Sequence, residues 1–183
     1  MPDHRSHRHA KHPASAALAG PYGHPFHPIL VTVPIGAWTS SLAFDVASHV
    51  TRDPSFLARG AMWLIALGVL GAVAAAAIGT LDLFVIPPAT RAFRTGVVHM
   101  LLNVLVTGAY AGNFLWRHAG DGPPGPVGAG MLALNAASLA VLAVSGYLGG
   151  KLAYHYGVRV ADEVTQSEGF VPVRGGARSG GPS

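Results

Sequence analysis

Four long apolar stretches constrain the fold of this chain more than any other feature. They lie at about residues 28–50, 61–86, 96–116 and 127–150. Each is near the twenty or so residues that a helix needs to cross a hydrocarbon core about 30 Å thick. Of the 183 residues, 50% are hydrophobic and 11% are charged. The sequence therefore predicts an all-α fold, a polytopic membrane four-helix bundle. Its predicted partner is the lipid bilayer, which surrounds the bundle.

The composition also excludes several kinds of chemistry. The chain has no cysteine, which rules out disulfides, thiolate metal sites, iron–sulfur ligation and c-type haem attachment. Any metal or haem must be held by His, Met, Tyr or carboxylate. Twelve Lys and Arg against eight Asp and Glu indicate loops that face anionic lipid rather than a nucleic-acid footprint. No hydrolase or nucleotide-binding motif occurs, so nothing in the sequence identifies an enzyme.

Changes in composition divide the chain into three parts, and helix-breaking residues separate the spans. Residues 1–22 are rich in His and Arg and are predicted to be a disordered tail, and residues 161–183 a disordered C-terminal tail. Residues 23–160 form the predicted transmembrane domain. Asp53-Pro54 and Pro87-Pro88 break the chain between spans, and Pro34 is expected to kink the first span.

The positive charges near the span ends predict the orientation. Four spans put both termini on one side of the membrane. Five cations lie on that side and three on the other: Lys11, Arg91, Arg94, Lys151 and Arg159 against Arg52, Arg59 and Arg117. The excess favours cytoplasmic termini.

Small residues recur at helical spacing in the last three spans. The pairs are Gly108 with Gly112, Gly146 with Gly150, and Ala75 with Gly79. Such pairs let helix backbones approach closely in lipid, so these spans are expected to pack tightly; the alternative is chance in an Ala- and Gly-rich composition. No internal repeat is apparent in the sequence.

Polar residues gather at one predicted membrane face. Alternating spans bring together the start of spans one and three and the end of spans two and four. This face receives His24, His27, Asp82, His99, Asn103, Lys151 and His155. Ionisable groups in spans normally face the bundle interior or water. The convergence therefore predicts the functional site.

His99 is the strongest single ligand candidate, because Asn103 lies four residues later on the same helical face and can orient its imidazole. The alternative is that His99 links helices structurally through Asp82 or a backbone group. Asp82 itself is expected to pair with His27, His99, Arg91 or Arg94.

His24 and His27 flank Pro25 on a stiff entry to the first span, which would preorganise one of them as a ligand. The alternative is an interfacial loop. At the opposite face, Asp45 and His49 are four apart, which permits a local structural pair.

Several of these residues carry a resemblance to a known family. His24-Pro25-Phe26-His27-Pro28, Gly79 with Asp82, His99 with Asn103, Gly149-Gly150 and Gly157-Val158-Arg159-Val160 resemble the bacterial membrane family catalogued as domain of unknown function 2231. The likeness covers about residues 23 to 160. It implies a four-helix protein of the bacterial plasma (inner) membrane.

The same resemblance implies redox chemistry, because some members are fused to Rieske-type iron–sulfur domains. It singles out His24, His27, Asp82 and His99. Members often have Glu or His after the Gly-Gly pair, where this chain has Lys151, so the resemblance supplies no ligand at that position.

Three functional hypotheses follow. The first is an electron-transfer component that binds b-type haem between His99 and either His24 or His27 and serves a redox partner protein. The second is a non-catalytic membrane module that binds a partner or ion, with the histidines and Asp82 as structural links. The third is a divalent metal site built from His24, His27, Asp82 and His99.

Overall fold

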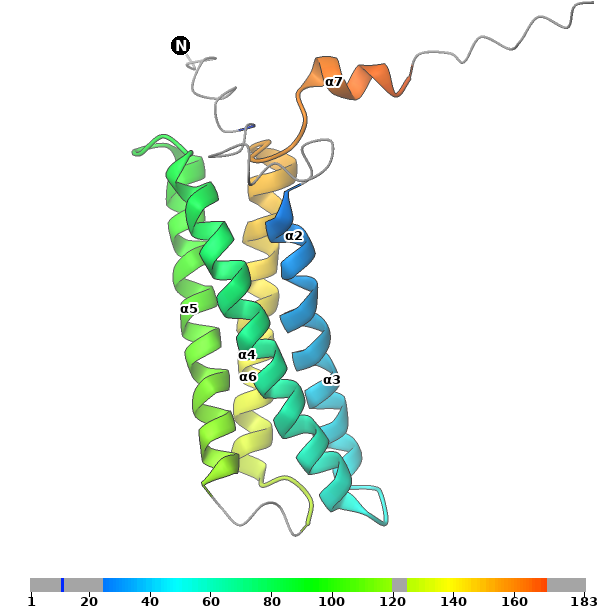
Figure 1. Cartoon of the computed structure of the whole chain (residues 1–183). Coiled ribbons are helices and arrows are strands. Elements are labelled where there is room, and N and C mark those ends of the chain that lie inside the picture. Colours follow the sequence, from blue (N-terminus) through cyan, green and yellow to red (C-terminus); the bar gives the residue numbers. More distant parts are fainter. Residues whose placement is uncertain (1–10, 12–24, 120–124, 171–183) are drawn as a thin grey trace, which may run out of the picture.

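The computed structural model describes residues 11, 25–119 and 125–170, and it is helical without strands over those residues (Figure 1). The elements are α2 (Phe26–Leu30), α3 (Thr32–Ser48), α4 (Pro54–Phe84), α5 (Arg91–His118), α6 (Ala129–Gly150), the π-helix η3 (Lys151–His155) and α7 (Glu163–Glu168). Within the described residues, four helices are long and apolar enough to cross a membrane: Phe26–Ser48, Pro54–Phe84, Arg91–His118 and Ala129–His155. The predicted all-α four-helix fold is confirmed.

The first span is interrupted at Val31, which separates α2 from α3. Pro34 follows three residues later. Its ring excludes the backbone hydrogen bond that Leu30 would otherwise accept, so the break lies where the predicted kink was expected.

The four spans form an antiparallel bundle with α3 and α5 on one diagonal and α4 and α6 on the other, because α3 and α5 each pack against α4 and α6. The centre is aromatic. The rings of Trp38 and Tyr110 stack with centroids 4.1 Å apart and planes 12° apart, and Ile65 and Val106 complete this cluster. Large apolar side chains cover the outside of the bundle, as expected for a surface that lipid solvates.

The predicted packing role of the small-residue pairs is right for one pair and wrong for two. Ala75 is buried and Gly79 lies against the His27 ring. Gly108, Gly112 and Gly146 are exposed, and a Cβ at any of them would meet no atom within 4 Å. Spacing places two such residues on one helical face but does not say which way that face points.

The C-terminal segment differs from the predicted disorder, since α7 forms within it. The side chain of Asp162 caps this helix by accepting from the Thr165 N–H at 2.8 Å, and that bond lowers the pKa of Asp162. Lys11 donates to Glu163 at 2.9 Å. The rest of the two predicted tails, residues 1–10, 12–22 and 171–183, lies outside the described residues.

Candidate functional site

Two imidazoles meet on the bundle axis at the end where α2 and α5 begin and α4 and α6 end (the upper end in Figure 1). The ring centroids of His27 and His99 are 6.4 Å apart and the ring planes are nearly perpendicular, at 81°. Asp82 lies within electrostatic range of His27. The predicted convergence of the first three spans at one face is therefore present.

Each histidine is fixed by a backbone carbonyl of a neighbouring helix. His27 Nδ1 donates to the Ala75 carbonyl at 2.9 Å, and His99 Nδ1 donates to the Ser145 carbonyl at 2.8 Å. A carbonyl can only accept, so in both rings the proton is on Nδ1 and the lone pair is on Nε2. This arrangement orients metal-ligating histidines in proteins.

A glycine underlies each ring, four residues after the carbonyl that holds it. A Cβ on Gly79 would lie 2.8 Å from His27 Cε1, and a Cβ on Gly149 would lie 3.0 Å from His99 Cε1. Both glycines are needed for the close approach of imidazole to helix backbone. We call the carbonyl and the glycine together a histidine seat: Ala75 with Gly79, and Ser145 with Gly149.

The predicted link between Asn103 and His99 is confirmed. Asn103 Nδ2 lies 2.9 Å from the His99 carbonyl and 3.1 Å from His99 Nε2. The amide thus donates to the lone pair that a ligand would use. Binding at this nitrogen requires the Asn103 side chain to move away.

Asp82 pairs with a residue that sequence reasoning did not consider. Its Oδ1 lies 2.9 Å from Arg159 Nε, and both side chains are largely buried. The expected partners Arg91 and Arg94 are exposed instead. Arg159 reaches Asp82 from a loop in which Gly157 and Arg159 both have left-handed backbones, with φ of 67° and 59°. The Gly-x-Arg pattern after the last span was the one available signal.

The remaining predicted site residues are not brought to the two rings. His24 lies outside the described residues. Lys151 lies 5.7 Å from the Tyr156 ring centroid, and the exposed His155 also contacts Tyr156. In the described part of the chain, no group of three or more His, Asp and Glu is placed to hold a metal ion. The divalent-metal hypothesis, which includes His24, stays a prediction.

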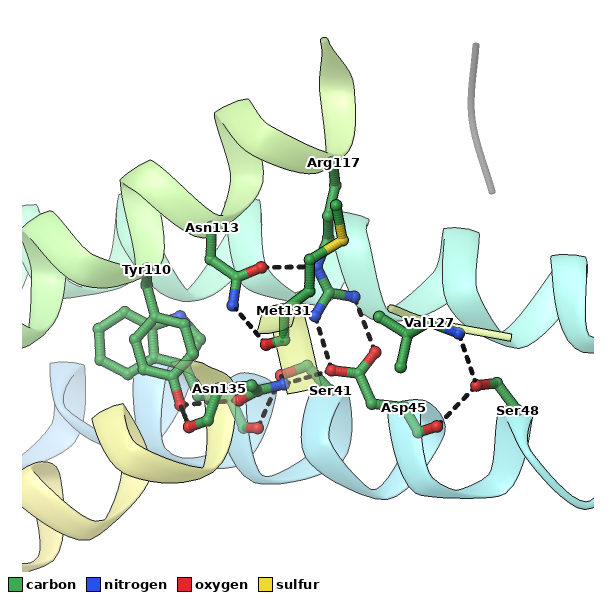
Figure 2. A network of polar contacts seen from close by, with 10 residues as sticks. Ser41, Asp45, Ser48, Tyr110, Asn113, Arg117, Val127, Met131 and Asn135 are labelled. Carbon is green, nitrogen blue, oxygen red and sulfur yellow. Dashed lines mark hydrogen bonds and ion pairs between the residues drawn. The ribbon is translucent and has the colours of Figure 1, made fainter. Parts of the chain in front are cut away.

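A second polar cluster fills the opposite end of the bundle (Figure 2). Arg117 donates from Nη1 and Nη2 to the two carboxylate oxygens of Asp45, each at 2.7 Å. The side chains are 3% and 0% exposed. Asn135 Nδ2 donates to Asp45 at 2.7 Å and to Ser41 at 3.1 Å. This is a completely buried, bidentate ion pair.

Further amides and hydroxyls complete this cluster. Arg117 Nε donates to Asn113 at 2.7 Å, and Asn113 donates to the Met131 carbonyl at 3.0 Å. The Tyr110 hydroxyl donates to the Asn135 side chain at 3.0 Å. Every polar group in Figure 2 is therefore bonded within the protein.

From the sequence, Arg117 was counted among the cations near the span ends, and His49 was the partner considered for Asp45. The expected structural role of Asp45 fits the structure, but its partners are Arg117 and Asn135. Two opposite charges near the same membrane face were the signal for their pairing. The hydrogen-bonded cluster ties α3, α5 and α6 together. At the other end, Nε2 of His27 and Nε2 of His99 carry lone pairs that could ligate a metal, although that of His99 accepts from Asn103.

Comparison with known proteins agrees with this architecture. A family model described as a predicted membrane protein (DUF2231) matches residues 23–162. No curated protein matches the chain, and neither does any solved structure.

Proposed function

Because the chain belongs to the DUF2231 family of predicted membrane proteins, we propose a function for a multi-pass membrane protein: it holds b-type haem between His27 and His99 and acts as an electron-transfer component. The observation that supports this proposal is the pair of neighbouring imidazoles, each with Nδ1 anchored to a backbone carbonyl, which leaves Nε2 as the nitrogen that could ligate.

The spacing of the rings fits this donor set. The two ring centroids are 6.4 Å apart, so the two imidazoles that would hold the haem are already neighbours in the bundle, and imidazole is a haem ligand in proteins. Gly79 and Gly149, on the two flanking helices, carry no side chain that would displace either ring.

When bound, haem would supply one-electron chemistry. The protein's own contribution is positional. The two backbone carbonyls fix the orientations of the rings. The Asn103 side chain would move away from His99 Nε2 when a ligand binds there. The buried Asp82–Arg159 pair sets the charge beside His27. Electrons would pass to or from a redox partner protein at this end of the bundle.

Absorption spectroscopy tests the proposal. The full chain, expressed with haem supply and purified in detergent, should show a Soret band at one haem per chain. His27→Ala and His99→Ala should each lose it, because each variant lacks one of the two residues that would hold the haem.

His118→Ala is the matched control, since His118 is exposed on the same helix and contacts Phe114 rather than the pair. Its spectrum should equal that of the unmodified chain. A chain without a Soret band, or a band retained in His99→Ala, would rule out this haem site.

A specific observation favours a second candidate, a non-catalytic membrane module. The same carbonyl bonds that orient the two rings also link α2 to α4 and α5 to α6. Under this reading His99→Ala lowers thermal stability while no chromophore or metal copurifies with the unmodified chain.

We also propose a bacterial plasma-membrane location with cytoplasmic termini. Lys11, Arg117 and Arg159 are in ion pairs with their side chains largely buried, so they do not count as loop cations. Three then remain on the side of the termini, Arg91, Arg94 and Lys151, against Arg52 and Arg59. A reporter that is active only in the cytoplasm should be active when it is fused to the C-terminus, and a reporter that is active only in the periplasm should be inactive there. The opposite result would show that the termini lie outside the cytoplasm.

A further inference from the structure

The two halves of the bundle repeat the same internal bonds. In the first helical hairpin, α2/α3 with α4, His27 donates to the carbonyl of residue 75. In the second hairpin, α5 with α6, His99 donates to the carbonyl of residue 145. The donors are 72 residues apart and the acceptors 70, so the donor and acceptor are separated by 46 residues in the second hairpin and by 48 in the first.

A second bond repeats at the same offsets. Trp38 Nε1 donates to the Ile65 carbonyl at 3.2 Å, and the Tyr110 hydroxyl lies 3.3 Å from the Asn135 carbonyl. The glycines of the two histidine seats are again 70 residues apart. All four residues of this second bond are buried, so the correspondence lies in the core.

Equivalent residues of the two hairpins also touch each other. Three such pairs, each separated by 72 residues, lie along the bundle: His27 with His99, Trp38 with Tyr110, and Asp45 with Arg117. A residue meets its own equivalent only on a two-fold axis. Both hairpins start at the same end of the bundle, so this axis runs along it.

We infer that the chain is a tandem duplication of one two-helix unit, that the inner face of each hairpin is an interface for the other, and that the charges of Asp45 and Arg117 decide which hairpins pair. Pairing of two first hairpins would bury two carboxylates together, and pairing of two second hairpins would bury two guanidiniums. Only the unlike pair satisfies both charges.

The connection between the hairpins makes such a choice necessary. It spans only residues 85–90, and Ala89 has a left-handed backbone with φ of 66°, which is strained for a residue with a Cβ. A short, strained connection permits exchange of units between chains, although in the unmodified chain it already joins two hairpins of complementary charge. Charge therefore has to specify the partner.

Complementary charge variants of the full chain test this inference. Asp45→Arg alone and Arg117→Asp alone each bury like charges and should lower Tm by about 10 °C or more, or prevent accumulation. When the two variants are co-expressed with different tags, exchanged hairpins restore both unlike pairs. The two chains should then copurify in equal amounts, whereas two tagged unmodified chains should not.

The double variant D45R/R117D exchanges the charges within one chain and provides an independent measurement. If positions 45 and 117 are equivalent, the double variant should recover at least half of the decrease in Tm that the single variants show. Recovery is incomplete because Asn113 and Asn135, which bond Arg117 and Asp45, are not exchanged. The inference is overturned if the double variant is no more stable than the singles, if the complementary variants do not copurify, or if unmodified chains copurify equally well. None of these readouts depends on the proposed haem.

Discussion

Replacing Arg117 with methionine should lower the free energy of unfolding by about 3–5 kcal/mol, the usual cost of removing one partner from a buried ion pair. Methionine roughly keeps the volume of the side chain but removes both bonds to Asp45 and the bond to Asn113. Asp45 is 0% exposed, so its carboxylate would remain without water or a cation. Thermal or chemical unfolding in detergent measures the loss.

Two controls separate the charge from the shape. Asp45→Leu combined with Arg117→Met removes both charges and should recover part of the loss, since apolar pairs often replace buried ion pairs at little cost. Glu163→Gln removes the exposed partner of the Lys11 pair and should change stability by about 1 kcal/mol or less. An equally small effect of Arg117→Met would mean that the cluster in Figure 2 does not hold the bundle together.

The sequence predicted the spans and their threading well, because both follow from hydrophobic length and from alternation across the membrane. The same reasoning brought His27, Asp82 and His99 to one end without knowledge of side-chain contacts. His99 with Asn103 was also accessible, since residues four apart share a helical face.

Contacts between distant helices were beyond that reasoning. Asp45 and Arg117 are 72 residues apart, and pairing them requires knowing which faces of α3 and α5 point to the axis. Arg117 is the penultimate residue of α5, so hydropathy alone places it in a loop. A backbone acceptor for His99 was one of the alternatives drawn from the sequence, but the residues of the two histidine seats could not be identified, because backbone carbonyls carry no sequence signal.

The repeat between the hairpins was hidden for a related reason. Equivalent positions conserve geometry more than residue type: Trp38 corresponds to Tyr110, and Asp45 corresponds to a residue of opposite charge. Packing on a two-fold axis demands complementary shape and charge rather than identity. Sequence comparison of the halves therefore shows few matches.

Substituting alanine for Gly68 should destabilise the bundle by about 2 kcal/mol or more, through overpacking and loss of a buried hydrogen bond. A Cβ at this position would overlap Trp38 Nε1 and would lie 2.5 Å from Trp38 Cδ1. The indole cannot retreat easily: it is 1% exposed, donates to the Ile65 carbonyl and stacks on Tyr110. Near-ultraviolet circular dichroism during thermal unfolding reports both the stack and the stability.

Gly108→Ala is the matched substitution, because Gly108 also lies inside a spanning helix but a Cβ there meets no atom within 4 Å. Alanine restricts the unfolded chain and favours helix, so this variant should gain up to about 1 kcal/mol. Opposite signs for the two glycines would locate the cost of Gly68→Ala in the indole stack rather than in the helix. Equal effects of the two substitutions would show that Trp38 moves freely and that the aromatic centre does not fix the spacing of the two hairpins.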